Sequence, residues 1–176
     1  MATTPRLITF DEWEQIPNPP GGRYELHHGE LVEVSSPLGP HVRAQWRLRR
    51  LLEPMAESTG IVHSEVPFRP LPEYEGWFAD VAYVTKSRWD GIVRCLEGAP
   101  ELVIEVLSPS NRASEMLERE RLCLGNGSVE FWVVDLEAKQ VRVSTNDGRV
   151  ANYQPGQSIP LFFAPGSSIE AASIFA

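Results

Sequence analysis

Apolar residues recur at helical spacing in two long segments of the chain. Over residues 41–57 they fall at intervals of three and four, which places them on one face of a helix. These residues are Ala44, Leu48, Leu51, Leu52 and Met55. Pro54 is expected to kink or shorten the last turn. A second helix is predicted from about Arg112 to Leu124, ended by Gly125-Asn126-Gly127, and a short one over Phe10–Gln15 follows the N-cap residue Thr9.

Between the helices the pattern predicts β-strands. Leu102–Leu107 is almost continuously apolar, which is typical of a central strand buried on both faces. The other predicted strands are Arg23–His28, Glu30–Val34, Ile61–Val66, Trp77–Val84, Glu130–Asp135, Val141–Ser144 and Val150–Tyr153. Gly29 and Asn146-Asp147-Gly148 mark hairpin turns. No linker or repeat interrupts the 176 residues, so a single α/β domain over residues 1–176 is expected.

Composition and charge narrow the class of protein. No run of eighteen apolar residues is present, so we expect no transmembrane helix, and residues 1–11 do not have the layout of a signal peptide. Cys95 and Cys123 are too few for a disulfide framework, and two free thiols fit the cytoplasm. The net charge of −8 argues against broad, non-specific DNA binding, which depends on phosphate neutralisation.

Three carboxylates stand where apolar residues would be expected. Glu105 interrupts the most apolar strand, Asp80 lies inside the predicted strand 77–84, and Glu25 lies inside the strand 23–28. A buried, unpaired carboxylate costs several kcal/mol or shifts its pKa. Each could instead be paired with an arginine or stand in water at a strand end. Two buried carboxylates on neighbouring strands, however, favour a hard divalent cation between them, either Mg²⁺ or Mn²⁺.

Four segments together resemble the Uma2 family, which is described as restriction-endonuclease-like and belongs to the PD-(D/E)XK nuclease superfamily. In order and spacing these segments are Arg23–Val32, Ala79–Val84, Glu101–Ser110 and Ser128–Asp135. The resemblance extends from about Phe10 to Phe175.

The resemblance implies a restriction-endonuclease-like α/β fold, with a central mixed β-sheet flanked by helices. It also implies that Asp80 and Glu105 bind the metal ion. Glu25 would be an added acidic member of the site, binding the metal directly or through water. Because similar nucleases pair to cut both DNA strands, the resemblance further allows a homodimer. The C-terminal apolar residues Ile169, Ile174 and Phe175 could then pack either on the core or on a second subunit.

The chain departs from the superfamily pattern at its lysine. The usual position, two residues after the second acid, holds Leu107. Uma2 proteins resemble one another in carrying a lysine on the following helix, and the matching position here holds Arg119. The family's tyrosine one turn later is matched by Cys123. Lys86 and Lys139, the two lysines of the chain, lie too far along the sequence from the acids to replace it.

Arginine stays protonated and cannot be a general base, but it can hold a phosphate oxygen and stabilise charge in the transition state. We therefore interpret Arg119 as a contact to the scissile phosphate. The alternative is a solvated helix face, where Arg119 would pair with neighbouring charges such as Glu115.

A basic stripe on the first long helix is the candidate nucleic-acid surface. It consists of Arg43, Arg47 and Arg50, and His41 opens the helix. These side chains could follow a phosphate backbone, or they could form an ordinary solvated face. The tryptophans, including Trp46, are expected in the core or at an interface rather than as stacking platforms.

Two functional hypotheses follow. The first is a Mg²⁺- or Mn²⁺-dependent endonuclease that hydrolyses phosphodiesters, with DNA as the expected substrate, Asp80, Glu105 and Glu25 as metal ligands, and Arg119 at the phosphate. The second is a catalytically degenerate nuclease fold retained as a binding or regulatory module. The acidic net charge and the missing lysine favour the second, and the intact set of buried carboxylates favours the first.

Overall fold

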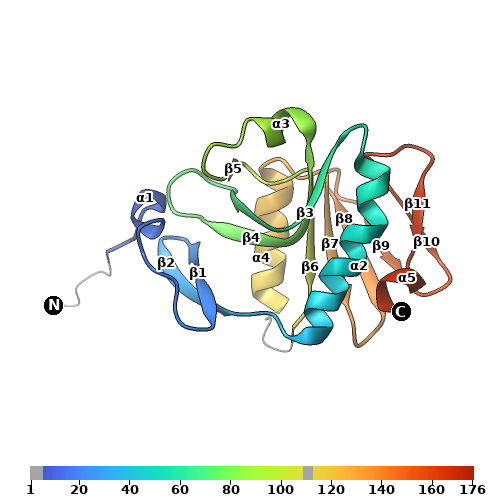
Figure 1. The fold of residues 1–176 in the computed structure, drawn as a ribbon, viewed down its shortest axis with the longest axis horizontal. Helices are drawn as coiled ribbons and strands as arrows, with labels where there is room; N and C mark the ends of the chain where they lie inside the picture. The colour runs from blue at the N-terminus through green and yellow to red at the C-terminus, as the bar shows by residue number, and fades with distance from the viewer. Residues whose placement is uncertain (1–5, 109–112) are drawn as a thin grey trace.

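A seven-stranded mixed β-sheet forms the centre of the part of the chain that the computed structural model describes, residues 6–108 and 113–176 (Figure 1). The strand order is β5–β3–β4–β6–β7–β8–β9. The strands are β3 (Gly60–Arg69), β4 (Trp77–Thr85), β5 (Leu96–Glu97), β6 (Leu102–Val106), β7 (Glu130–Asp135), β8 (Gln140–Thr145) and β9 (Val150–Tyr153). Strands β6 and β7 are parallel, as are β3 and β5, and the other neighbours are antiparallel.

Two long helices cover opposite faces of this sheet. Helix α2 (Gly39–Ala56) packs on one face, and helix α4 (Ala113–Gly125) packs on the other. Helix α4 connects β6 to β7, because parallel neighbours need a crossover rather than a tight turn. The predicted start of this helix at Arg112 lies outside the described residues, and its predicted end near Gly125 is confirmed.

Smaller elements complete the fold. At the N-terminal side are α1 (Phe10–Trp13) and the hairpin β1 (Gly22–His27)–β2 (Glu30–Ser35). Elsewhere lie α3 (Lys86–Asp90), the hairpin β10 (Ser158–Pro160)–β11 (Ser168–Glu170) and α5 (Ala172–Phe175). The sequence pattern did not anticipate β5, α3 or the last three elements, because segments of two to five residues are too short to show periodicity.

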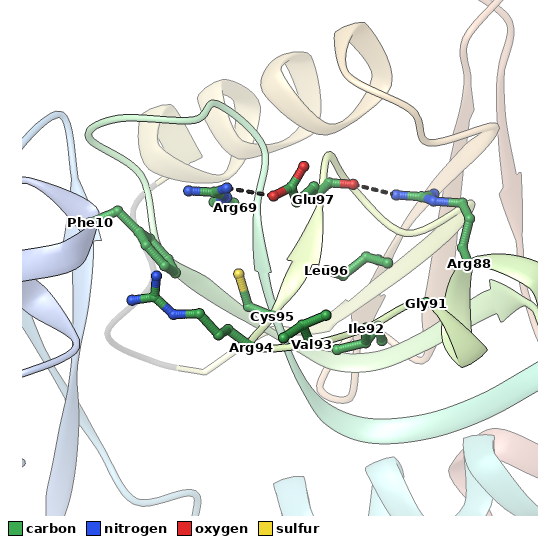
Figure 2. Close-up of a pocket in the computed structure, with 10 residues that line it drawn as sticks. All are labelled: Phe10, Arg69, Arg88, Gly91, Ile92, Val93, Arg94, Cys95, Leu96 and Glu97. Atoms are coloured by element: carbon green, nitrogen blue, oxygen red, sulfur yellow. Dashed lines mark hydrogen bonds and ion pairs between the residues drawn. The ribbon is translucent and has the colours of Figure 1, made fainter.

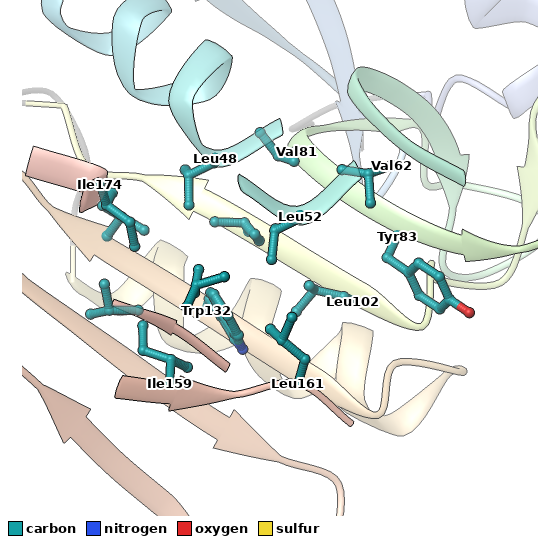
Figure 3. Packing of buried hydrophobic residues seen from close by; sticks show 14 of the residues in the cluster. Leu48, Leu52, Val62, Val81, Tyr83, Leu102, Trp132, Ile159, Leu161 and Ile174 are labelled. Carbon is teal, nitrogen blue, oxygen red and sulfur yellow. The ribbon is translucent and has the colours of Figure 1, made fainter. Parts of the chain in front are cut away.

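The two faces of the sheet bury separate apolar cores. Under α2, Leu48 and Leu52 meet Val81 and Trp132, as Figure 3 shows. The C-terminal Ile169 and Ile174, together with Phe175, also pack here, so they contribute to the chain's own core. The core under α4 contains Val66, Phe68, Trp77, Ala79, Val103, Met116, Cys123 and Phe131 among its members.

Helix α2 differs in detail from its prediction. It begins at Gly39, two residues before His41, with Pro40 in the first turn, where a missing N–H costs nothing. Pro54 does not shorten it, because the helix continues to Ala56. Met55, expected on the apolar face, is 39% exposed, because the buried row of the last turns runs through Leu52 and Ala56 and leaves Met55 at its edge.

Strands β3 and β4 both change face halfway along their length. Val62 packs under α2, whereas Val66 and Phe68 of the same strand pack under α4. Residues separated by an even number share a face in a regular strand, so β3 must rotate between them. Strand β4 does the same, with Ala79 under α4 and Val81 under α2.

Glu65 and Asp80 lie at this change of face. The ladder pairs Ser64 with Val81 and Val66 with Ala79, and Glu65 and Asp80 stand between these two pairs. Glu65 has a φ of 56°, a left-handed conformation that costs a non-glycine residue about 1 kcal/mol or more. Such local strain is typical of functional sites. The rotation turns the Asp80 carboxylate out of the regular alternation and toward α2.

Among the described residues, no helix is both long and apolar enough to cross a membrane. Trp77 and Trp132 are fully buried, as expected of core tryptophans, but Trp46 is 56% exposed and is not a core residue.

The packing of α2 predicts the effect of truncating Leu48. Because this side chain is fully buried, Leu48→Ala should lower the free energy of unfolding by about 2–5 kcal/mol through lost burial and a residual cavity. Met55→Ala, at a partly exposed position of the same helix, is the matched control and should lower it by clearly less. Urea denaturation followed by circular dichroism measures both, and equal effects would contradict the packing described.

Candidate active site

The three carboxylates predicted from the sequence lie together in the structure. Val81 pairs with Ile104 across β4 and β6, so the next ladder position brings Asp80 beside Glu105. Glu25 comes from β1, which lies against β4, and its Oε1 accepts the Phe78 N–H at 3.1 Å. Asp80 and Glu105 are each 8% exposed and Glu25 is 3% exposed. Their expected burial is therefore confirmed.

Arg119 lies among these carboxylates. Its Nε donates to Glu105 Oε1 at 2.9 Å and its Nη1 to Glu25 Oε2 at 2.9 Å. Its Nη2 donates to the Phe78 carbonyl oxygen at 2.5 Å, and the guanidinium lies 4.9 Å from the centroid of the Trp77 ring. With its side chain only 11% exposed, Arg119 does not belong to a solvated helix face. Arg119 thus lies among the three carboxylates, and its contact to a scissile phosphate stays a prediction.

The pKa values of Glu25 and Glu105 shift in opposite directions. Burial raises the pKa of Glu25, but the charge of Arg119 and the hydrogen bonds from His27 and Arg119 outweigh it and bring this pKa to about 2. Burial raises the pKa of Glu105 well above its usual value; the charge of Arg119 lowers it in part, while repulsion from Asp80 and Glu25 adds to the rise. Arg119 thus compensates the burial of Glu25 fully and that of Glu105 only in part.

Asp80 is held by groups from α2 and β6. Its Oδ2 accepts the Val106 N–H at 2.8 Å, and its Oδ1 accepts a hydrogen bond from Gln45 Nε2 at 3.0 Å. His41 Nε2 lies 3.0 Å from the same Oδ1, although it makes no aligned hydrogen bond among the described residues. Burial lowers the pKa of His41, but Asp80 and Glu65 raise it by more, so the net shift is upward.

Gln45 and Glu65 are site residues that sequence reasoning missed. Gln45 Nε2 also donates to Glu65 Oε1 at 2.5 Å, and the other oxygen of Glu65 pairs with Arg23. One amide group therefore bridges Glu65 and Asp80. The sequence did carry a signal for Gln45, because it is a polar residue within the apolar face of α2. Nothing in the sequence distinguished Glu65 from a surface glutamate.

Two histidines and one cysteine near these side chains differ in their contacts. His27 Nε2 lies 3.0 Å from Glu25 Oε2, so it approaches the site. His28 is not part of the strand: it has a φ of 52° and pairs with Glu75 and Glu118. Cys123, one turn after Arg119, is fully buried, and burial raises the pKa of its thiol.

The donor set fits a hard divalent cation at Asp80 and Glu105. Both are carboxylates on adjacent strands, and the pKa of Glu105 is raised chiefly by burial that Arg119 compensates only in part. Glu25 fits less well, since Arg119 already pairs with its Oε2 and its pKa is about 2. Within residues 6–108 and 113–176, no group of three or more His, Cys, Asp or Glu side chains is arranged to hold a metal ion. Arg119 instead bridges Glu25 and Glu105 through its two ion pairs.

The predicted nucleic-acid residues divide into two sets. His41 lies on the inner side of α2 beside Asp80, so it belongs to the carboxylate site. Arg43 and Arg50 are exposed, and Arg47 is half-buried.

A surface pocket of about 370 Å³ lies away from these carboxylates, beside α1, α3 and β5 (Figure 2). Three arginines line it, but each is already paired. Arg69 binds Glu97 at 2.6 Å, Arg88 binds Glu101 at 3.2 Å, and Arg94 binds Asp11 at 3.1 Å. With its positive charge neutralised in this way, the pocket is a poor anion site.

Comparisons with known proteins agree with the fold described above. The profile of the Uma2 family, described as "Putative restriction endonuclease", matches residues 9–172. A solved structure from Anabaena variabilis ATCC 29413, titled as a "putative nuclease belonging to DUF820", superposes with a TM-score of 0.82. Its sequence is 19% identical, and the match covers 96% of this chain and 97% of that one, which establishes the shared fold. A search of curated proteins found no match.

The ion pair between Glu25 and Arg119 predicts a pH-dependent effect on stability. A carboxyl whose pKa falls from 4.5 to about 2 on folding stabilises the protein fully above pH 4.5, and this contribution is lost as the pH falls toward 2. Glu25→Gln should therefore lower the free energy of unfolding by on the order of 3 kcal/mol at pH 7 and by clearly less at pH 3.

Urea denaturation at the two pH values measures this difference. Glu33→Gln, at an exposed position on the neighbouring strand β2, is the matched control and should have little effect at either pH. Equal losses for Glu25→Gln at pH 7 and pH 3 would show that the carboxylate charge does not stabilise the fold.

Proposed function

The chain belongs to the Uma2 family, and we propose that it is a Mg²⁺- or Mn²⁺-dependent endonuclease that hydrolyses phosphodiester bonds of DNA. The observation that carries this proposal is the buried pair Asp80–Glu105. Two carboxylates side by side on adjacent strands, with one arginine shared between Glu105 and Glu25, lack the positive charge that their burial requires. A divalent cation supplies it.

In this proposal Asp80 and Glu105 hold the metal ion. When bound, the ion would lower the pKa of a coordinated water and polarise the phosphoryl oxygen. Asp80 suits this role because Gln45 and the Val106 N–H fix the orientation of its carboxylate. A ligand held in one rotamer binds without further loss of side-chain entropy.

Arg119 contacts the scissile phosphate. Its guanidinium has five N–H donors, and the contacts to Glu105, Glu25 and the Phe78 oxygen use three of them. Two donors remain for a phosphate oxygen. Burial lowers the pKa of Arg119, but the charges of Glu105 and Glu25 outweigh it and keep this pKa raised, so Arg119 acts as a fixed positive charge and exchanges no proton.

Glu25 acts first as the counter-ion of Arg119. Its low pKa keeps it ionised, and its hydrogen bond from the Phe78 N–H ties the β1–β2 hairpin to β4. Direct metal binding by Glu25, as the family resemblance implies, requires Arg119 to release one of its oxygens. A water molecule between Glu25 and the metal ion satisfies both roles.

The alternative function is a degenerate nuclease fold kept as a binding or regulatory module. A specific observation favours it: the guanidinium of Arg119 occupies the position between Glu25 and Glu105 and neutralises part of their charge without a metal ion. The guanidinium of Arg119 would then take the place of the metal ion. Metal binding distinguishes this alternative from the nuclease.

Titration with Mn²⁺ should raise the melting temperature of the wild-type protein. At a hundredfold excess over the dissociation constant, binding adds about 2.7 kcal/mol, which corresponds to roughly 5–10 °C for a domain of this size. Asp80→Asn and Glu105→Gln should each abolish most of the shift, because each removes a ligand charge. Glu57→Gln, at an exposed position just after α2, is the control and should retain the shift. No shift in the wild type would favour the degenerate module.

Incubation with supercoiled plasmid and Mn²⁺ should produce nicked circles. Asp80→Asn, purified in parallel, should nick at least about 100-fold more slowly, since metal-assisted activation of water supplies several kcal/mol. EDTA should stop the reaction, and Glu57→Gln should nick at the wild-type rate. Equal nicking by the wild type and Asp80→Asn would mean contamination and would contradict the assignment of Asp80.

A further inference from the structure

The outward side of α2 combines positive charge with an exposed aromatic ring. Arg43, Trp46 and Arg50 are spaced three and four residues apart, so they form one stripe on the helix surface. All three are exposed to solvent, and the indole of Trp46 is 56% accessible. The opposite side of the helix carries the buried Leu48 and Leu52, so this stripe faces away from the sheet.

The orientation of Trp46 favours a stacking contact with a ligand. The Arg50 guanidinium lies 4.9 Å from the centroid of its ring, within cation–π distance. This contact limits the freedom of the indole and covers one of its faces, which leaves the other for a planar group. Val42 and Leu38, 45% and 76% exposed, extend the apolar surface one and two turns toward the start of the helix.

The positive charge of α2 favours a polyanion as the ligand of this surface. The helix contains four arginines and one glutamate, whereas the whole chain has a net charge of −8. A second copy of the chain placed symmetrically on this face would bring the two sets of arginines together, which is unfavourable. A nucleic-acid backbone instead places phosphates beside Arg43 and Arg50.

The stripe begins on the same helical turns that contact the carboxylate site from the inner side. His41 and Gln45, on the inner side of the first two turns of α2, contact Asp80. Trp46 projects from the outer side of the same turns, so the two surfaces are separated by about one helix diameter, roughly 10–12 Å. A strand bound on the outer face can therefore pass around the start of α2 toward Asp80.

We infer that this face of α2 binds single-stranded nucleic acid, with a base stacked on Trp46 and phosphates held by Arg43 and Arg50. The bases of a duplex are covered by their neighbours, whereas an unpaired base presents its full ring to an indole. This inference rests on the proposed function, since it names the form of nucleic acid that approaches the same site: a single strand or a locally opened duplex.

Binding is tested without cleavage, in EDTA, by the fluorescence anisotropy of a fluorescein-labelled deoxythymidine 20-mer. Trp46→Ala should raise the dissociation constant about tenfold or more, because base–aromatic stacking is lost. Trp46→Phe keeps an aromatic ring and should raise it less than about threefold. Tyr74→Ala removes an exposed aromatic ring on the β3–β4 connection and, as the matched control, should leave it unchanged. A duplex of the same length should lose little affinity on Trp46→Ala.

Three results would overturn the inference. They are an unchanged dissociation constant in Trp46→Ala, no binding of the 20-mer by the wild type, and light scattering that shows a dimer dissociated by Trp46→Ala with binding intact. The last result would identify the face as a contact between copies of the chain.

These outcomes are separate from those of the nuclease proposal. Trp46-dependent binding without metal-dependent nicking would leave the binding surface in place and reject the nuclease. Nicking that is lost in Asp80→Asn, together with full binding by Trp46→Ala, would support the nuclease and reject the binding surface.

Discussion

The ion pairs of Arg119 connect the parts of the molecule that the candidate site requires. From α4 the guanidinium reaches Glu105 on β6, Glu25 on β1 and the Phe78 carbonyl on β4. The β1–β2 hairpin is a separate two-stranded sheet, and these side-chain contacts, together with the backbone hydrogen bonds between Leu26 and Gly76, fix its position on the central sheet. Buried carboxylates would otherwise destabilise the fold, because each needs a partner that replaces water. The arginine thus makes it feasible to bury the acids, and the acids in turn hold the helix and the hairpin against the sheet.

The second constraint is the change of face in β3 and β4. A regular strand would direct Asp80 to the same side as Ala82, under α4, and away from Gln45. The rotation at Glu65 and Asp80 directs the carboxylate toward α2 instead, where Gln45 bridges these two acids. The left-handed conformation of Glu65 is the local cost of this geometry. Asp80 and Glu105 can therefore be neighbours while helices on opposite faces of the sheet hold them.

Sequence patterns predicted most of this arrangement, and the missing parts have physical reasons. Strand β6 and its single carboxylate could be found because a charge within a continuous apolar run conflicts with burial. The burial of Arg119 could not be predicted from its own helix, where the surrounding sequence is polar. It depends on contacts with strands that are distant in the sequence. The left-handed conformation of Glu65 could not be predicted for the same reason. Only the pairing of β3 with β4 defines the position at which the strands rotate. Met55 shows the opposite error: helical spacing places it on the apolar face, but the buried row runs through Leu52 and Ala56 and leaves Met55 at its edge.

Helix α2 brings these constraints together, because its two sides meet different demands. The inner side needs apolar residues for the core and, in its first two turns, polar groups that orient Asp80, and Gln45 and His41 supply these groups. The outer side is free of packing demands, so an exposed tryptophan beside arginines is not explained by the fold. An acidic protein that must approach a polyanion has to concentrate its positive charge near the reacting atoms, where screening over a Debye length of about 10 Å still leaves an attraction. The first turns of α2 meet this condition, because they stand closest to Asp80. The overall charge of −8 and a nucleic-acid surface are therefore compatible in this fold.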